Sequence, residues 1–404
     1  MKNRNIAVIV VIIFILSCHT KPFADSIDVC EINNNYFNNV TEVNREFKPE
    51  KIQNVPRYTL KFIAGGDNLY HYSVLRGSMI DGEYHFLPIY SYITDIVKSA
   101  DLAFLNQETI MGGTRFGYTG FPSFNTPQIL ASVLVEAGFD VISLANNHAM
   151  DRGAAGLYAT LDFLDTIEEL TVIGARREGE SARIITKNNI SLGFLAYSFG
   201  MNGGPLPSDN PNLVSLINRE VMIREITALR PLCDFLVVSM HWGEEYRLEP
   251  DRSQTSLAQF LAEHEVDLVI GHHPHVLQRV ETITRPSGGE TLVFYSLGNF
   301  ISNQRERERL IGGMAVVTFV KEGFTLECGE FTGELFMTDT GVLPVVSHFD
   351  LDIRNYRVYP LWLYTQELLE NHGFRKYDPE GFTIDFFYSV LDRLKTNVIM
   401  NNPF

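Results

Sequence analysis

Val269-Ile270-Gly271-His272-His273-Pro274-His275 places three histidines directly behind a short apolar run that begins at Val266. An apolar run that ends in glycine is typical of a buried strand, so we expect the histidines in the loop that follows it. Neutral imidazole is the commonest protein metal ligand, and two imidazoles in one turn can hold an ion together. The stretch therefore predicts a metal-binding loop. The alternative is a surface loop that happens to be rich in histidine.

Polar side chains also follow four other predicted strands. These strands cover residues 60–64, 102–105, 141–145 and 235–240, and the residues behind them are Asp67, Glu108, Asn147 with His148, and His241. Strands that alternate with helices imply an α/β core, in which ligands bind outside the carboxyl ends of the strands. Taken singly, each of these residues could instead have a local role: Asp67 as a loop cap, Glu108 as a solvent-facing side chain, Asn147 as a turn residue and His148 as a buried core histidine.

The mixture of carboxylate, carboxamide and imidazole indicates which cation the site would hold. Such a set suits Zn²⁺, Mn²⁺ or Fe better than Ca²⁺. The candidates outnumber the four ligands of a single zinc ion, so we expect two divalent ions that share a ligand. Asn299 follows the strand at residues 292–297 and either orients a ligand or caps its loop.

Composition narrows the class of protein. The 404 residues carry a net charge of −16, which argues against nucleic-acid binding, because that needs a basic face. An anionic substrate is still compatible with this charge, since bound divalent ions would supply positive charge. The four cysteines form no Cys-x-x-Cys pair, so a zinc ribbon is not expected, although Cys30 and Cys328 could pair after export.

The amino-terminal segment predicts export and membrane attachment. Lys2 and Arg4 precede an apolar run at residues 6–16 that is too short for a comfortable membrane span. The run ends in Leu16-Ser17-Cys18, which resembles the bacterial lipobox, so residues 1–18 are predicted to be a lipoprotein signal peptide with Cys18 lipidated. The alternative is an uncleaved signal anchor. In either case we expect an extracytoplasmic protein, periplasmic or on the cell surface, with residues 19–56 as a polar tether.

Helices are expected at several positions between and after these strands. Apolar spacing predicts one helix over residues 87–100, and Thr126-Pro127 is typical of a helix start, with threonine as N-cap and proline at the first position. Beyond about residue 310 the sequence alternates as in strands, at residues 314–320 and 331–337, and residues 355–360 are expected to form a final edge strand. Two further helices are predicted over residues 360–371 and 383–397.

Taken together, the motifs resemble those of a known family. They occur in order over about residues 58–302 as Gly66-Asp67, Asn106-Gln107-Glu108, Ala145-Asn146-Asn147-His148, His241-Trp242-Gly243, Gly271-His272-His273-Pro274-His275 and Tyr295-Ser296-Leu297-Gly298-Asn299-Phe300. They look like the successive motifs of the CapA/PgsA family, the bacterial capsule (poly-γ-glutamate) synthesis proteins. That family is similar in fold to the calcineurin-like metallophosphoesterases.

The resemblance implies an α/β fold, a four-layer αββα sandwich at residues 57–320, with residues 321–404 as a β-rich and helical extension packed on it. It implies that Asp67 and His275 hold one metal and that Glu108 bridges to a second. The second metal would be completed by Asn147, His241 and His273. His148 would be the catalytic residue that contacts the substrate or protonates the leaving group. His272 could exchange roles with His273, and His272 and Asn299 are the candidates for substrate binding.

One position departs from the pattern of the metallophosphoesterases. They usually begin with Asp-x-His, whereas Leu69 stands at the third position here, and the nearby His71 is offset by two residues. The capsule family also commonly lacks that histidine, so the departure favours the capsule family, but it leaves one metal short of a ligand.

Three functions follow from these expectations. The first is an assembly factor that binds an anionic surface polymer such as poly-γ-glutamate, working with other capsule-synthesis membrane proteins. The second is a metal-dependent hydrolase of a phosphoester or amide at the cell surface. The third is a metal-free scaffold, for which Leu69 is the only support.

Overall fold

The computed structural model describes residues 55–179, 182–325 and 331–404. The predicted signal peptide, Cys18, nearly all of the tether and the Cys30–Cys328 pair lie outside the described residues. The chain divides into two compact units: residues 59–320 with 336–404, and residues 1–58 with 321–335. The elements that build the site belong to the first of these units.

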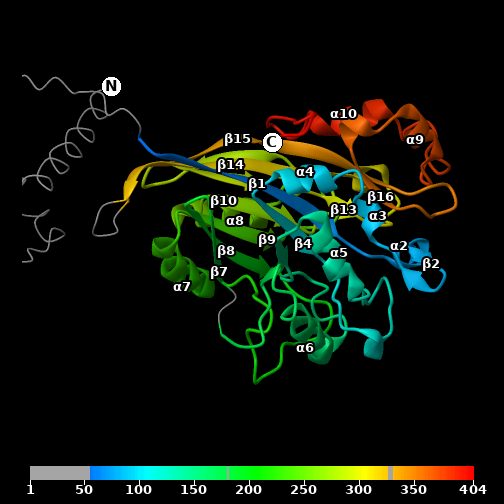
Figure 1. Cartoon of the computed structure of the whole chain (residues 1–404), viewed down its shortest axis with the longest axis horizontal. Helices are drawn as coiled ribbons and strands as arrows, with labels where there is room; N and C mark the ends of the chain where they lie inside the picture. The colour runs from blue at the N-terminus through cyan, green and yellow to red at the C-terminus, as the bar shows by residue number, and fades with distance from the viewer. Residues whose placement is uncertain (1–54, 180–181, 326–330) are drawn as a thin grey trace, which may run out of the picture. The chain divides into compact units, whose positions relative to one another are not determined.

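The core contains two large β-sheets (Figure 1). The first follows the order β16-β15-β14-β1-β4-β5-β6, with β13 also paired to β1. Its strands are β1 (Arg57–Asn68), β4 (Leu102–Gln107), β5 (Val141–Ser143), β6 (Thr171–Ile173), β13 (Asn299–Ile301), β14 (Ile311–Thr325), β15 (Phe331–His348) and β16 (Arg357–Pro360). The second follows the order β11-β12-β10-β9-β8-β7. Its strands are β7 (Arg183–Lys187), β8 (Ile190–Ser198), β9 (Phe235–His241), β10 (Leu268–His272), β11 (Val280–Thr284) and β12 (Glu290–Phe294).

Short helices and one small hairpin connect these strands. The α-helices are α2 (Tyr72–Gly77), α3 (Leu87–Tyr90), α4 (Thr94–Ser99), α5 (Ile129–Ala137), α6 (Gly153–Leu164), α7 (Arg219–Leu229), α8 (Arg252–Glu263), α9 (Gln366–Asn371) and α10 (Ile384–Leu391). The hairpin pairs β2 (Met79–Ile80) with β3 (Glu83–Tyr84). Among the described residues, no helix is both long enough and apolar enough to span a bilayer.

The two sheets face each other through an aromatic contact layer. The ring of Phe62 in β1 lies 6.2 Å from that of Phe194 in β8, and the ring of Phe235 in β9 lies 4.7 Å from that of Phe319 in β14. Phe62 and Phe194 are completely buried. Burying each such ring stabilises the fold by about 1.5–3 kcal/mol, so the layer fixes how the sheets face each other.

Helices cover the outer face of each sheet. On the second sheet, Ile226 of α7 and Leu261 of α8 pack in one buried cluster with Val238 of β9. On the first sheet, Tyr90 of α3 donates from its hydroxyl to Asn68 Oδ1 (3.1 Å), and its ring stacks on Phe300 of β13. The order helix, sheet, sheet, helix confirms the predicted α/β sandwich.

Some local predictions were wrong. The helix expected over residues 87–100 is interrupted between α3 and α4, where i→i+3 hydrogen bonds such as Ile93 N to Tyr90 O replace the helical ones. Thr126 is not a helix cap, because its hydroxyl donates to Thr109 Oγ1 in the interior (2.7 Å) and α5 begins only at Ile129. Tertiary contacts have overridden the local signal in both places.

The carboxyl-terminal region adds both strands and helices. The expected boundary at residue 320 falls inside β14, and β15 and β16 extend the first sheet to its edge. The predicted helices are shorter than expected, since α9 covers only residues 366–371 and α10 only residues 384–391. The chain after α10 returns to the sheet, where Val342 N donates to Asn397 O (2.9 Å).

Candidate metal centre

Parallel strand pairing gathers the predicted ligands at one edge of the two sheets. β1, β4 and β5 run parallel in the first sheet, and β9 and β10 run parallel in the second. Their carboxyl ends carry Asp67, Glu108, Asn147, His241 and the histidine loop. The six predicted ligands are at most 4% exposed: Asp67, Glu108, Asn147, His241, His273 and His275.

Asp67 is turned inward by an irregularity in β1. The pairing of β1 with β4 shifts register between Gly65 and Asp67, which re-aims the side chain as a β-bulge does. Gly66 makes this possible, because a Cβ at that position would lie 2.1 Å from Gly298 O. Asp67 Oδ2 then lies 2.9 Å from His275 Nδ1, and Asn106 Nδ2 donates to Asp67 Oδ1 (2.8 Å).

The charge of Asp67 is stabilised by its neighbours. Burial alone would raise the pKa of the carboxyl group, but the interactions with His272 and His275 outweigh it and hold the pKa well below the ordinary value. Asp67 is therefore an anionic oxygen donor at the base of the site.

Glu108 lies between two histidines from different loops. His241 Nε2 and His275 Nε2 are each 3.6 Å from Glu108 Oε1, which is too far for a hydrogen bond. Both carboxylate oxygens of Glu108 are buried without a hydrogen-bond partner. Burial raises its pKa well above the ordinary value, although the charge of His275 opposes the shift. This central position is the one that a bridging carboxylate requires.

His241 and His273 form the other side of the cluster. His241 Nε2 lies 3.0 Å from Asn147 Oδ1, and the rings of His241 and His273 lie 4.8 Å apart. Phe199 lies over both rings, with centroids 6.2 Å and 4.4 Å away. Burial lowers the pKa of His241, and it lowers that of His273 to about 4, so both imidazoles are neutral and have a lone pair for a cation.

His275 is different, because two carboxylates surround it. Burial lowers its pKa, but the charge of Glu108 and the hydrogen bond to Asp67 raise it to about 9. The histidine loop is also held in an uncommon backbone conformation, with φ of 94° at His273 and 58° at His275. Non-glycine residues adopt such angles at a cost and cluster at functional sites, which is consistent with a loop shaped for binding.

The buried polar atoms of this cluster fit divalent cations. Most buried polar groups in proteins are hydrogen-bonded, yet here several are not. The side-chain atoms without a partner include Glu108 Oε1 and Oε2, His241 Nδ1, His272 Nδ1 and Nε2, His273 Nδ1, Asn106 Oδ1 and Asn299 Oδ1. Within the described part of the chain, three sets of residues bring potential ligand atoms within 4.8 Å of one another: Asp67 with Glu108 and His275, Glu108 with His241 and His273, and Glu245 with His273 and His275.

His272 stays outside these three sets. It ends β10 fully buried, with Nδ1 3.4 Å from Asp67 Oδ1 and its ring stacked on Phe104. Of the histidines in Gly271-His272-His273-Pro274-His275, His273 and His275 therefore join the candidate ligand sets of the described residues and His272 does not. His272 lies beneath the cluster.

His148 lies beside the cluster and is oriented by an acidic partner. Its Nδ1 is 2.8 Å from Asp151 Oδ2, which also accepts from Phe124 N. The ring meets that of Phe124 edge-on, with centroids 4.6 Å apart. This arrangement fixes the orientation of the imidazole through Nδ1.

Asn299 and His71 have structural contacts. Asn299 Nδ2 donates to Arg309 O (2.9 Å) and to His275 O (3.3 Å), so it braces the histidine loop. His71 Nδ1 accepts from Asn303 N, and among the described residues it joins none of the three ligand sets. Leu69 is 2% exposed and belongs to the core. Neither His71 nor Leu69 therefore contributes to the ligand sets that the described residues form.

Sequence reasoning missed Glu245 and Asp151. Asp151 follows His148 by three residues, a spacing that places both side chains at one turn. Glu245 lies in the exposed loop after β9, and only its proximity to His241 in the sequence could have drawn attention to it.

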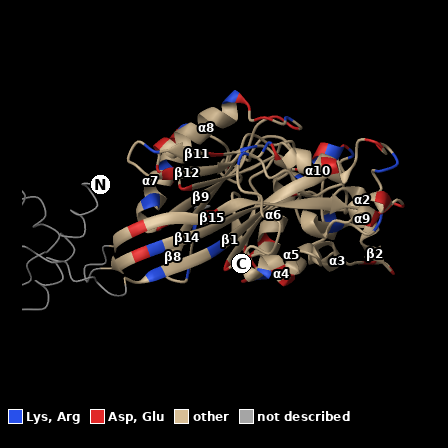
Figure 2. Cartoon of the chain, turned by 90° about the horizontal axis from the view of Figure 1, so that it is seen from above, with Lys and Arg blue, Asp and Glu red and all other residues tan. Residues whose placement is uncertain are grey.

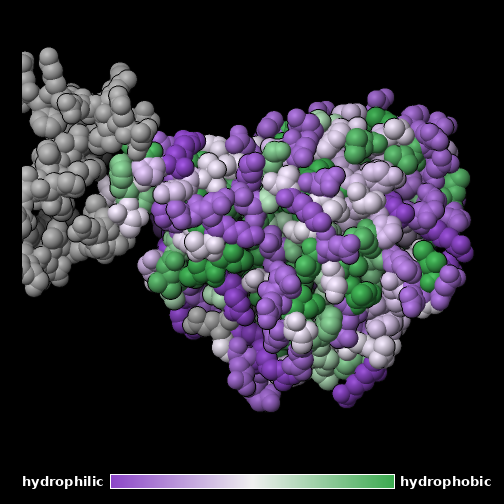
Figure 3. Space-filling model, in the orientation of Figure 1, coloured by the Kyte–Doolittle hydropathy of each residue, from purple (hydrophilic) through white to green (hydrophobic). Residues whose placement is uncertain are grey.

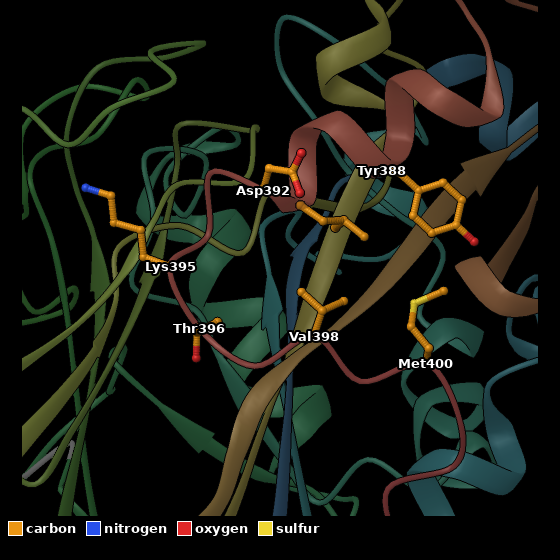
Figure 4. A pocket seen from close by; sticks show the side chains of 7 residues that line it. Tyr388, Asp392, Lys395, Thr396, Val398 and Met400 are labelled. Carbon is orange, nitrogen blue, oxygen red and sulfur yellow. The ribbon is translucent and has the colours of Figure 1, made fainter.

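A separate cavity of about 580 Å³ lies by α10 (Figure 4). It is lined by Tyr388, Leu391, Asp392, Lys395, Thr396, Val398 and Met400. None of these is a predicted site residue, and the group combines only one carboxylate with one amine. The potential metal ligands are therefore clustered at the strand ends and not in this cavity.

The surface is mixed in charge and polarity. Acidic and basic residues are interspersed in the view of Figure 2, and Figure 3 shows a largely hydrophilic face with scattered hydrophobic groups.

The chain is similar in sequence to known proteins. Residues 61–304 match the family described as bacterial capsule synthesis protein PGA_cap. The chain belongs to this family. Over 179 residues it is 33% identical to the capsule biosynthesis protein CapA of Bacillus anthracis, covering 42% of this chain and 41% of that protein. Over 176 residues it is 32% identical to the PGA biosynthesis protein CapA of Bacillus subtilis (strain 168), covering 43% and 45%.

The matched part spans less than half the length of these two CapA relatives. Among solved structures, the calcineurin-like phosphoesterase YfkN of Bacillus subtilis is similar with a TM-score of 0.40 at 14% identity, covering 70% of this chain and 91% of that one. The NAD nucleotidase NadN of Haemophilus influenzae gives a TM-score of 0.43 at 12% identity, with 85% and 57% covered. The family assignment depends on the sequence match alone.

Proposed function

We propose that this PGA_cap protein acts in the synthesis, export or anchoring of an anionic surface polymer such as poly-γ-glutamate, through a two-metal site. The observation that carries the proposal is the cluster of buried, unpaired oxygen and nitrogen donors around Glu108. The name of the Bacillus subtilis relative, a PGA biosynthesis protein, supports the choice of polymer.

In this proposal the predicted ligands keep their roles. Asp67 and His275 hold one ion, Asn147, His241 and His273 hold the other, and Glu108 is shared between them. The donor set suits Mn²⁺, Zn²⁺ or Fe. Two divalent ions would make the site locally positive, so a polyanion can bind a protein whose net charge is −16.

Attachment to the membrane completes the proposal. A lipid on Cys18 would hold the domain at the extracytoplasmic side of the cell membrane, where other capsule-synthesis membrane proteins deliver the polymer. No nucleic acid is involved. Labelling with a radioactive or clickable palmitate tests this, because label should be incorporated into the full chain and lost in Cys18→Ser.

Hydrolysis of a phosphoester or an amide is a second candidate, favoured by the His148–Asp151 pair. When bound, the cations would polarise the substrate and lower the pKa of the attacking water. Asp151 holds Nδ1 of His148, so that Nε2 can deliver a proton to the leaving group. Asn299 would keep the histidine loop in place during this step.

One preparation separates the two candidates. We would purify the full chain in detergent, load it with Mn²⁺, and measure poly-γ-glutamate binding, poly-γ-glutamate cleavage and phosphoester hydrolysis, with His241→Ala as the control. We expect Mn²⁺-dependent polymer binding that His241→Ala abolishes. Turnover that His148→Ala removes without loss of metal would establish the hydrolase. Polymer binding that is unchanged by removal of metal would contradict the proposal.

A further inference from the structure

We propose that Glu245 is an additional ligand of the metal centre, reaching it from the solvent side. The inference builds on the metal site proposed above and assigns a residue that the sequence motifs did not indicate. A carboxylate oxygen of Glu245 and one nitrogen each of His273 and His275 all lie within 4.8 Å of one another. Glu245 thus lies close to one ligand of each proposed ion, and unlike the buried Glu108 it is an exposed residue.

The loop that carries Glu245 is tied to the histidine loop. Tyr246 N donates to Pro274 O (2.7 Å), and Gln278 Nε2 donates to Arg247 O (2.8 Å). Tyr246 takes a left-handed conformation with φ of 68°, so the backbone turns directly after Glu245. An exposed loop residue is therefore held beside His273 and His275 by hydrogen bonds to the main chain of the two residues that follow it, Tyr246 and Arg247.

A second observation points to a ligand at this position. His273 is 4% exposed, and its Nδ1 is buried without a hydrogen-bond partner. An imidazole nitrogen in that state has lost its hydrogen bonds to water without gaining another partner, which is unfavourable. A cation held jointly by His273, His275 and Glu245 would satisfy it.

Glu245 also changes which cation the site prefers. The chain has no donor at Leu69, so an additional oxygen from Glu245 raises the carboxylate share of the set. Carboxylate donors suit Mn²⁺, whereas sets dominated by imidazole favour zinc and copper. We therefore expect Glu245 to strengthen Mn²⁺ binding more than Zn²⁺ binding.

The adjacent Glu244 provides a matched control. It carries the same charge one residue earlier, its side chain is 69% exposed, and Arg247 Nη1 donates to it (3.2 Å). The comparison is Glu245→Gln with Glu244→Gln, each in the full chain. The readouts are bound Mn²⁺ and Zn²⁺ by equilibrium dialysis with elemental analysis, and the metal-induced shift in melting temperature.

We expect Glu245→Gln to weaken Mn²⁺ binding at least about tenfold, with a smaller loss for Zn²⁺, and Glu244→Gln to bind as wild type does. An equal loss of metal affinity in both variants would mean that the effect comes from the change in net charge, and it would overturn the inference. Wild-type affinity in Glu245→Gln would overturn it while leaving the metal centre intact. A wild-type chain that binds neither ion would instead refute the proposed metal centre, and this inference with it.

Discussion

At the scale of single residues, Glu108 gives the clearest indication that the site binds a cation. Its carboxylate is fully buried, both oxygens lack hydrogen-bond partners, and the nearest imidazoles are 3.6 Å away. Without a cation, such a group destabilises the fold, because burial raises its pKa and the carboxyl group must take up a proton to become neutral. Because Glu108 destabilises the fold in the absence of a cation, we interpret it as a cation ligand.

Glu108→Gln should therefore have opposite effects with and without metal. In EDTA the amide removes the cost of neutralising the buried carboxyl group, and we expect the free energy of unfolding to rise by about 1–3 kcal/mol. With Mn²⁺ the variant should lose the stabilisation by metal that the wild type shows. Urea unfolding in both buffers measures this, with Glu244→Gln as the exposed control. A variant less stable than wild type in EDTA would contradict this prediction.

His148 and Asp151 give a second prediction at the same scale. Asp151→Asn removes the carboxylate that holds His148 Nδ1 but leaves the metal ligands in place. If the protein turns over a substrate, we expect kcat to fall by about 10²–10⁴-fold with Mn²⁺ content unchanged. Steady-state kinetics paired with elemental analysis checks this. Loss of metal together with kcat would show that Asp151 supports the ligands instead.

The sequence was most informative about residues at strand ends. The end of each apolar run predicts where a strand ends, and parallel strands end at the same edge of a sheet. This is why the sequence predicted Asp67, Glu108 and His241 as site residues. Glu245 could not be found in that way. It lies on an exposed loop, and a main-chain hydrogen bond between Tyr246 and Pro274, which no side-chain pattern encodes, places it at the site.

At the scale of elements, β10 and its loop hold the site. β10 lies between β9 and β12, and Gly271 lets it approach β12 closely. A Cβ at Gly271 would meet Tyr295 O at 2.0 Å and Tyr295 C at 2.5 Å. Because these are backbone atoms, they cannot move aside as a flexible side chain can.

Gly271→Ala should therefore destabilise the protein by about 2–4 kcal/mol and weaken metal binding, since the histidine loop begins at the next residue. Gly200→Ala is the matched control, because its Cβ would meet no atom within 4 Å. Thermal unfolding in EDTA and in Mn²⁺ measures both effects. Equal stability of the two variants would show that β10 and β12 can separate without harm.

Helix boundaries were the least predictable part of the fold. Thr126 is a residue type that often caps helices. In the folded chain, however, its hydroxyl donates a hydrogen bond to Thr109 Oγ1. By contrast, Thr383 does cap α10, with its side chain accepting from Phe386 N. The same residue type has either role, and tertiary neighbours decide which.

At the scale of the whole molecule, the C-terminal region contributes stability that depends on pH. His372 is fully buried, with Nε2 3.1 Å from Ser347 O and Nδ1 accepting from Phe374 N. Burial, with a smaller effect from His348, lowers the pKa of His372 to about 3 from an ordinary 6.5. The folded protein therefore keeps His372 neutral, whereas the unfolded chain takes up a proton below pH 6.5.

The sign of the effect follows from this difference. The stabilisation is complete above pH 6.5 and is lost as the pH falls toward 3. At pH 5 the loss from this group amounts to about 2 kcal/mol. We expect His372→Gln, although less stable at pH 7, to lose about 2 kcal/mol less than wild type between pH 7 and pH 5. Denaturant unfolding at both values tests this, with the exposed His85→Gln as control. Identical pH dependence in His372→Gln and wild type would contradict it.

The two facing sheets have parallel central strands, and this architecture brings motifs that are far apart in the sequence together in one site. Asp67 and His275 are 208 positions apart in the chain, yet their side chains lie 2.9 Å apart. The sequence predicted this meeting from the class of fold. It could not predict which of His272 and His273 faces the cluster, because that depends on the left-handed backbone at His273.

The most direct measurement is anomalous X-ray diffraction from crystals of the full chain grown with Mn²⁺. We predict two anomalous peaks on either side of Glu108, one beside Asp67 and His275 and the other beside Asn147, His241 and His273. Crystals of His241→Ala should lose the second peak. No anomalous peak within ligand distance of Glu108, at Mn²⁺ concentrations that saturate other manganese proteins, would contradict the central claim.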